Sequence, residues 1–246
     1  MTRSFLIRGL LVGLLAGAVA FVVAHFLGEP SVAAAIAVEE SSHAAEHMHG
    51  DQVVLVSRDI QASVGLLTAL LLFGAALGGV FGIGAAVAQG RLGRLGARAT
   101  SALLALAGFV TISLVPFLKY PANPPAVGDP STIARRSGLY FAMLALSLLF
   151  AVAAVWVARR LHTLSTWNRC LAGVATFVVL VGVAYAVLPA VDEVGTFPAD
   201  VLWRFRMGSL ATQLSVWSTL GLAFGALTER AAAPTTVGED KPLVAV

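Results

Sequence analysis

Apolar residues in this chain gather into six long blocks that short polar segments separate. Each block holds about twenty residues, the number that a helix needs to cross roughly 30 Å of hydrocarbon. The blocks are apolar on all sides rather than along one stripe, as is typical of helices that face lipid. The pattern therefore predicts an all-α protein, a polytopic membrane bundle of about six transmembrane helices, over Phe5–Leu27, Ile60–Ala88, Thr100–Leu118, Leu139–Ala158, Leu171–Leu188 and Met207–Leu227.

Composition supports this class and excludes others. Apolar residues make up 58% of the chain and charged residues 12%, about half of the charge that coats a soluble domain. The formal net charge of +3 suggests nucleic acid as a partner. However, the basic residues lie in short clusters between apolar blocks, where membrane topology accounts for them, so we expect the lipid bilayer and no nucleic acid as partner. A single cysteine, Cys170, excludes an internal disulfide and a cysteine metal cluster.

The charges of the connecting segments predict the orientation. The segments on the side of the two termini carry ten of the sixteen basic residues and three of the thirteen acidic ones, and the opposite segments carry the rest. Since positive segments stay inside, we expect both termini to be cytoplasmic in a multi-pass protein of the cell membrane. Residues 1–229 would form one transmembrane domain with an external His/Glu-rich loop at 28–59, and residues 230–246 a disordered cytoplasmic tail.

The first block also resembles a signal peptide. Arg3 and Arg8 form a positive start, and Ala33–Ala37 offers small residues for cleavage. Its apolar run exceeds the 7–15 residues of a usual signal sequence. A retained first helix is therefore the favoured interpretation, and cleavage is the alternative.

Two further external segments are rich in turn-forming residues. Four prolines between Lys119 and Arg136 exclude a continuous helix there. Within this segment, Asp129 or Ser131 is a candidate N-cap for the fourth helix, and Asp200 is a candidate N-cap for the sixth.

Charged residues cluster before the sixth predicted helix. Arg204 and Arg206 follow Asp192 and Glu193 along one external segment. We expect an external ion-pair cluster that fixes this loop. An anion-binding role for the two arginines is the less favoured interpretation.

Glycines recur at four-residue spacing in three of the predicted helices. Such spacing lets helix backbones approach closely. Packing within one bundle is the favoured interpretation, and a dimer interface is the alternative. The steps comprise Gly9, Gly13 and Gly17, then Gly74, Gly78 and Gly82, and finally Gly221 and Gly225.

The external His/Glu-rich loop contains the strongest candidate for metal binding. Three of the five histidines, His43, His47 and His49, fall within seven residues, with Glu46 among them. If this part is helical, His43 and His47 share one face, and imidazole suits Co, Ni, Cu and Zn. The alternative is a merely solvated polar loop. His25, near the outer end of the first helix, is either a further ligand on an ion path or a residue wetted at the interface.

Enzyme and energy-coupling motifs are absent from the sequence. The chain has no Walker A sequence, no G-x-S-x-G and no H-E-x-x-H. No acidic residue lies in the middle of a predicted span, which disfavours a carboxylate relay for protons or cations. We therefore expect no enzyme activity, and a lipid-modifying enzyme lacks any catalytic constellation.

Three stretches carry a resemblance to a known family. The runs Pro116–Met143 and Leu188–Leu214 and the His-rich stretch Gly28–His49 resemble the CbtA family of probable cobalt transporter subunits over about residues 1–230. This resemblance implies a multi-helix inner-membrane protein that imports cobalt for cobalamin synthesis. It also implies a small single-helix, His-bearing partner of the CbtB type.

The expected function combines the two lines of argument. The chain would be a cobalt(II), or nickel, uptake permease subunit that captures the ion at the external loop and passes it through the bundle. The ion is then cargo, and no permanently bound cofactor is expected. The alternative is a non-transporting membrane scaffold or sensor that binds metal, and the oligomeric state stays open.

Overall fold

The structure is a computed structural model, and it describes residues 2–45, 56–91 and 95–232. The described residues form helices and connecting loops and no strand. Six helical segments are long and apolar enough to cross a membrane, which confirms the all-α, six-span prediction. They are Thr2–Ser41, Arg58–Ala88, Ala97–Lys119, Pro130–Arg160, Thr166–Val187 and Ala199–Ala232.

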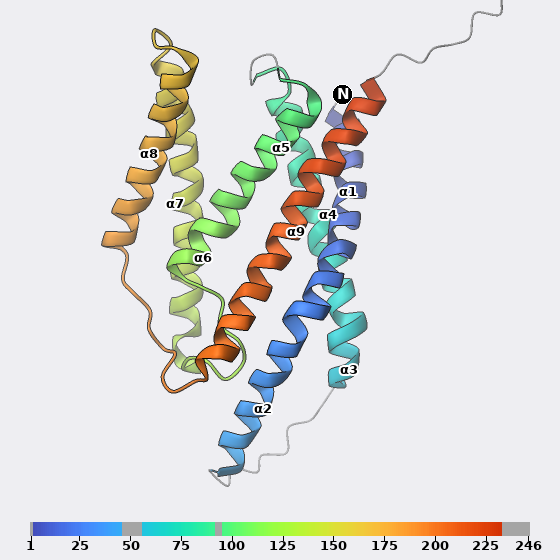
Figure 1. The fold of residues 1–246 in the computed structure, drawn as a ribbon, viewed down its shortest axis with the longest axis vertical. Helices are drawn as coiled ribbons and strands as arrows, with labels where there is room; N and C mark the ends of the chain where they lie inside the picture. Colours follow the sequence, from blue (N-terminus) through green and yellow to red (C-terminus); the bar gives the residue numbers. More distant parts are fainter. Residues whose placement is uncertain (1, 46–55, 92–94, 233–246) are drawn as a thin grey trace, which may run out of the picture.

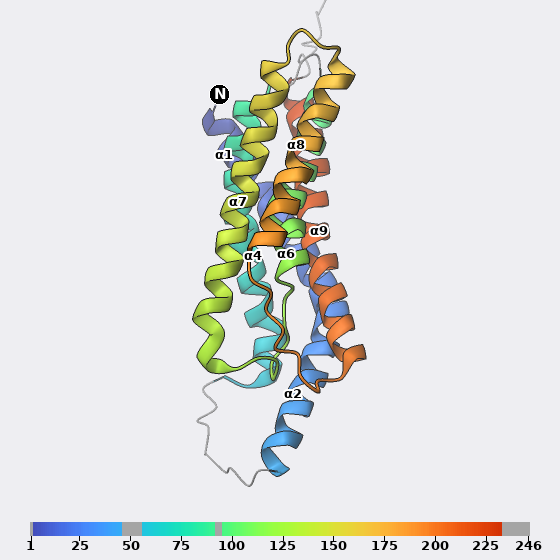
Figure 2. The same cartoon turned by 90° about the vertical axis from the view of Figure 1, so that its left-hand side faces the viewer.

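The helices form two groups that stand side by side (Figures 1 and 2). One group joins the first, second, third and sixth spans, and the other is a hairpin of the fourth and fifth. The first group comprises α1 (Thr2–Val23), η1 (Ala24–Gly28), α2 (Glu29–Ala45), α3 (Arg58–Ile60), η2 (Gln61–Gly65), α4 (Leu66–Ala88), α5 (Ala97–Gly108), η3 (Phe109–Leu114), α6 (Val115–Lys119) and α9 (Ala199–Ala232). The hairpin comprises η4 (Pro130–Thr132), α7 (Ile133–Arg160) and α8 (Thr166–Val187), and α7 contacts α6 and η3.

The two ends of the described chain lie on the same side of the bundle. Figure 1 shows the start of α1 and the end of α9 together at the top, and α2 at the opposite end. An even number of spans requires this arrangement. That the shared side is the cytoplasmic one stays a prediction from the charge distribution.

A seam of glycines joins α1 to α4. A Cβ added to Gly13 would overlap the carbonyl oxygen of Gly74, and one added to Gly9 would overlap that of Gly78. The two backbones are therefore in direct contact, as small-residue spacing permits in membranes. These glycines thus pack helices together within one bundle, as the favoured interpretation of their spacing predicted.

Large side chains fill the space where α9 crosses this helix pair. Phe224 lies between Phe5 of α1 and Phe81 of α4, with ring centroids 5.9 and 5.3 Å apart. Trp217 and Leu220 continue the same buried face of α9. Gly225 and Gly221 let α5 approach α9 closely at Arg98 and Ala105. The four-helix group thus has one continuous apolar core.

Two prolines interrupt spans without ending them. In a regular α-helix the ring of Pro30 would clash with the carbonyl group of Phe26, four residues earlier, and Pro116 would clash with that of Ile112. Phe26 lies in η1 and Ile112 in η3, both of which are wider π-helical turns. These turns absorb the proline clash, and the chain stays helical past each one.

This continuation corrects the expected loop at 28–59, because residues Glu29–Ala45 are helical. Alanine and glutamate are strong helix formers, and they dominate this segment.

The two ends of α9 also differ from expectation. α9 begins at Ala199, so Asp200 lies in its first turn rather than at the N-cap, and α9 extends to Ala232, past the expected start of a tail at 230.

We expect Gly13→Val to destabilise the bundle by roughly 1–3 kcal/mol or more, since the new side chain would enter the α1–α4 backbone contact. Gly182→Val is the matched control, because a Cβ at Gly182 on α8 meets nothing within 4 Å. Thermal unfolding of both purified variants in detergent measures the difference. Equal melting temperatures would contradict the claim that the close α1–α4 contact at the glycines stabilises the bundle.

Candidate functional site

A cavity of about 720 Å³ lies between the two helix groups at the α2 end of the molecule. One wall is a face of α9 that presents Arg206, Ser209 and Gln213. These residues are spaced at i, i+3 and i+7, as required for one helix face. The opposite wall is a face of α7 that includes Arg136 and Tyr140. The cavity thus combines charged and amide groups with membrane-spanning helices.

The remaining walls are largely apolar. Leu66 and Leu70 come from α4, Phe117 from α6 and Val32 from α2. The loop after α6 adds Asn123. Clefts of this volume and mixed lining are the usual form of a small-molecule site.

Three polar side chains form hydrogen bonds between the third span, at η3, and α9, next to the cavity. Trp217 Nε1 donates to Ser113 Oγ at 3.0 Å, and Ser113 Oγ donates to Gln213 Oε1 at 3.1 Å. Ser113 belongs to the π-helical turn η3, and Ser113 and Gln213 both line the cavity. Polar groups at this depth are costly in a membrane and mark functional positions.

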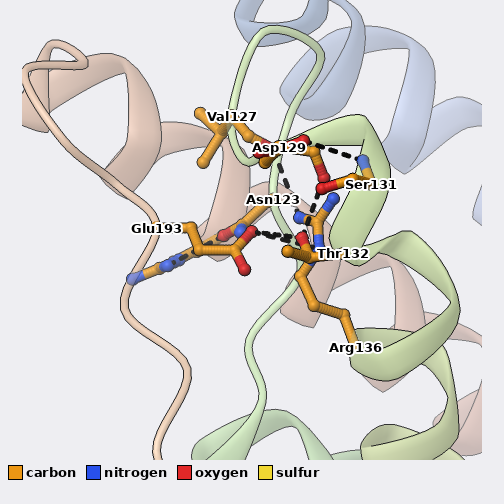
Figure 3. Close-up of polar contacts among 8 residues, drawn as sticks. Asn123, Val127, Asp129, Ser131, Thr132, Arg136 and Glu193 are labelled. Atoms are coloured by element: carbon orange, nitrogen blue, oxygen red, sulfur yellow. Dashed lines mark hydrogen bonds and ion pairs between the residues drawn. The ribbon is translucent and has the colours of Figure 1, made fainter.

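An ion pair at the cavity edge joins the start of α7 to the loop before α9 (Figure 3). Arg136 Nε lies 3.3 Å from Glu193 Oε2, and Thr132 Oγ1 donates to the same carboxylate oxygen at 2.9 Å. The arginine also donates to the Val127 carbonyl oxygen at 3.3 Å. Gly128, with φ of +97°, lies against this pair, and a Cβ there would overlap the Arg136 guanidinium. The pair therefore holds the 188–198 loop against the start of α7.

Asp129, one of the two N-cap candidates in the sequence, caps the 3-10 turn η4 that leads directly into α7. Asp129 Oδ1 accepts the backbone N–H of Ser131 at 2.8 Å. This hydrogen bond stabilises the carboxylate form and holds the pKa of Asp129 below its ordinary value. Since the folded state then binds fewer protons, the cap stabilises at neutral pH, and its contribution is lost as the pH falls through the lowered pKa.

The ion pairs around the start of α9 differ from those expected. Glu193 pairs with Arg136 of α7, and Arg204 pairs with Asp200 within α9 at 3.8 Å. Arg206 instead donates to the Ala122 carbonyl oxygen at 3.3 Å and to Asn123 Oδ1 at 3.0 Å. The predicted cluster of the two arginines with Asp192 and Glu193 does not form among the described residues, because Glu193 and Arg206 bind partners from other segments.

His25 is half-buried in the π-helical turn η1. Its Nδ1 lies 3.2 Å from the carbonyl oxygen of Ala62 in η2. A carbonyl oxygen only accepts, so Nδ1 carries the proton and a neutral ring keeps Nε2 as its ligand atom. His25 does not line the cavity, although its neighbours Ala24 and Gly28 do.

The other predicted metal ligands lie at the far end of α2 or beyond it. His43 is on the last turns of α2, and Glu46, His47 and His49 lie outside the described residues. His43 follows His25 by eighteen positions on one continuous helix, about 27 Å along its axis. The two would therefore bind an ion at separate points. Within the described ranges, no group of three His, Cys, Asp or Glu side chains comes together.

Sequence reasoning missed the cavity residues Gln213, Ser113 and Asn123. Gln213 carries a signal that was available, since an amide in the middle of an apolar span is rare and costly. Ser113 and Asn123 carry no such signal, because serine is common in membrane helices and asparagine in loops.

A family model described as "Probable cobalt transporter subunit (CbtA)" matches residues 2–229 of the 246. The chain belongs to the CbtA family. Membership confirms the resemblance seen in the sequence and makes the chain a probable cobalt transporter subunit, which agrees with its six spans. The description as a subunit implies a partner. The chain matches no curated protein and no solved structure.

We expect Glu193→Gln to lower the free energy of unfolding by roughly 1–3 kcal/mol, because Arg136 would stay enclosed without its counter-charge. The two side chains are only 22% and 21% exposed. Asp200→Asn is the matched control, since that residue and Arg204 are 67% and 74% exposed and such pairs contribute about 0–1 kcal/mol. Chemical unfolding in detergent compares the two. Equal losses would contradict a structural role for the Arg136–Glu193 pair.

Proposed function

We propose that this CbtA-family chain is a cobalt(II) uptake permease subunit of the cell membrane. Its outer segment captures the ion through His43, Glu46, His47 and His49. The ion then moves along the inner surface of α2, past His25, and enters the bundle. The observation that supports this path most directly is the cavity of about 720 Å³ at the α2 end.

Three features support uptake, with the ion entering from the side of α2. The acidic residues gather on the side of α2, and the basic ones on the side of the termini, as expected for an external α2 end. An acidic outer surface raises the local concentration of divalent cations. The candidate ligands His43, His47 and His49 belong to the segment on that same side, so capture would precede entry.

The coordination chemistry fits transient binding. Neutral imidazole and carboxylate together suit Co²⁺ and Ni²⁺. A site whose ligands all come from one short stretch of the chain would bind with modest affinity, which permits release into the cavity. A small single-helix partner of the CbtB type would complete the transporter.

We expect the triple variant His43/His47/His49→Ala to lose most uptake of radiolabelled cobalt in cells that express this chain with the small partner. His162→Ala is the matched control, since that exposed histidine follows α7 on the side of the termini. Excess unlabelled nickel added to the wild type tests metal selectivity. Uptake that survives in the triple variant would refute capture at these histidines. Metal binding without any uptake would instead support the scaffold or sensor function.

Uptake should also weaken as the external pH falls below about 6.5, the ordinary pKa of imidazole. Protonated imidazole cannot coordinate a metal, so loading is lost on the acid side. Initial uptake rates between pH 5 and 8 measure this. A profile that is flat across this range in the wild type would contradict imidazole ligation.

A further inference from the structure

Arg206 is the cavity residue that the proposed metal path leaves unexplained. It is half-buried at the start of α9 and has no carboxylate partner among the described residues. Its contacts are two neutral oxygens, the Ala122 carbonyl and Asn123 Oδ1. An enclosed charge without a counter-charge is costly, so this position calls for an anionic ligand.

The geometry of its hydrogen bonds leaves donors available. A guanidinium has five N–H groups in a planar fork, and here Nε and one N–H of Nη2 are engaged. Nη1 and the second N–H of Nη2 have no protein acceptor among the described residues. Such a fork matches the paired oxygens of a carboxylate or phosphate.

A second donor lies on the same face of α9, two turns further along. Gln213 Oε1 accepts a hydrogen bond from Ser113, which leaves its amide NH₂ without an acceptor among the described residues. Both Gln213 and Arg206 line the cavity. Across from them, Tyr140 of α7 lines it too, with a hydroxyl that engages no described hydrogen-bond partner.

The charged residues of the cavity wall also indicate an anionic ligand. Glu29 is paired with Arg58, and Glu193 with Arg136. The charged residues that line the cavity are Glu29, Glu193, Arg136 and Arg206, and Glu29 finds its counter-charge in Arg58, outside the lining. Arg206 is therefore the lining residue without a counter-charge among the described residues, and an anion would be attracted at this point of the wall.

The shape of the cavity indicates an anion with an apolar part. Its volume of about 720 Å³ far exceeds that of a small inorganic ion. Leu66, Leu70 and Phe117 provide an apolar surface on the walls between the α9 and α7 faces. We propose that this cavity binds an organic anion, with its carboxylate or phosphate oxygens on Arg206 and Gln213 and its apolar part against α4 and α6.

Two sources carry this chemistry, namely an anionic phospholipid of the bilayer and a water-soluble organic carboxylate. The full chain, purified in neutral detergent and free of metal, distinguishes them. Native mass spectrometry counts bound phosphatidylglycerol against phosphatidylcholine, and calorimetry measures binding of octanoate. Because neither measurement uses metal or uptake, failure here would leave the proposed transport function untouched.

We expect Arg206→Gln to weaken binding of the preferred anion about tenfold or more, since a charge-assisted hydrogen bond is lost. Arg135→Gln is the matched control, because Arg135 is an exposed arginine at the same end of the molecule that does not line the cavity. Gln213→Leu should weaken binding less, and melting temperatures show whether each variant is folded. Arg206→Lys, which keeps the charge but not the fork, should give an intermediate affinity.

Retention of phosphatidylglycerol alone would identify the lipid, and octanoate binding alone would identify a soluble carboxylate. Two results would overturn the proposal. One is a wild-type protein that prefers neither anion over phosphatidylcholine. The other is a folded Arg206→Gln variant that binds as tightly as the wild type or as the Arg135→Gln control.

Discussion

Every backbone N–H and C=O group that faces hydrocarbon must find its partner inside the chain, and this constraint shapes the whole molecule. It requires each of the six spans to be helical from one face of the bilayer to the other. The structure tolerates Pro30 and Pro116 only where a π-helical turn takes up the displaced carbonyl group. Both turns adjoin the cavity, through Gly28 in η1 and Ser113 in η3. The irregular turn at each proline thus faces the cavity on one side, while Phe26 and Leu27 of η1 are exposed on the other.

Helix association in lipid depends on close packing rather than on a hydrophobic force between helices. The α1–α4 glycine seam provides this packing. Phe224 and Trp217 of α9 are buried in the core of the same four-helix group. The α7–α8 hairpin has fewer contacts with this group, through α6, η3 and the hydrogen-bonded loops at the α2 end. The cavity lies between the four-helix group and this separate hairpin. The Arg136–Glu193 pair then fixes the edge of the cavity.

Local patterns in the sequence were enough to predict the spans, the close packing of the glycine-spaced helices and Asp129 as one of two candidate caps, because each pattern is formed by residues within a few helical turns. Partners distant in sequence were not predictable in this way. Glu193 in the loop before α9 pairs with Arg136 of α7, and Arg206 of α9 bonds Asn123 in the loop after α6. The helical course of residues 29–45 was also missed, since Glu-Pro after an apolar block usually ends a helix. Here the π-helical turn before it removes the clash.

The proposed metal path and the proposed anion cavity have opposite electrostatic requirements, and Arg206 is the residue where they would meet. A divalent cation that reached the cavity alone would face a guanidinium without a counter-charge among the described residues. An organic anion on Arg206 would neutralise this charge, and the anion's remaining oxygens would add ligands for the cation. Oxygen ligands hold cobalt(II) less firmly than the imidazoles of the outer segment. The ion would then pass from a nitrogen-rich capture site to a weaker oxygen-rich one, and its release inward would depend on the anion as much as on the protein.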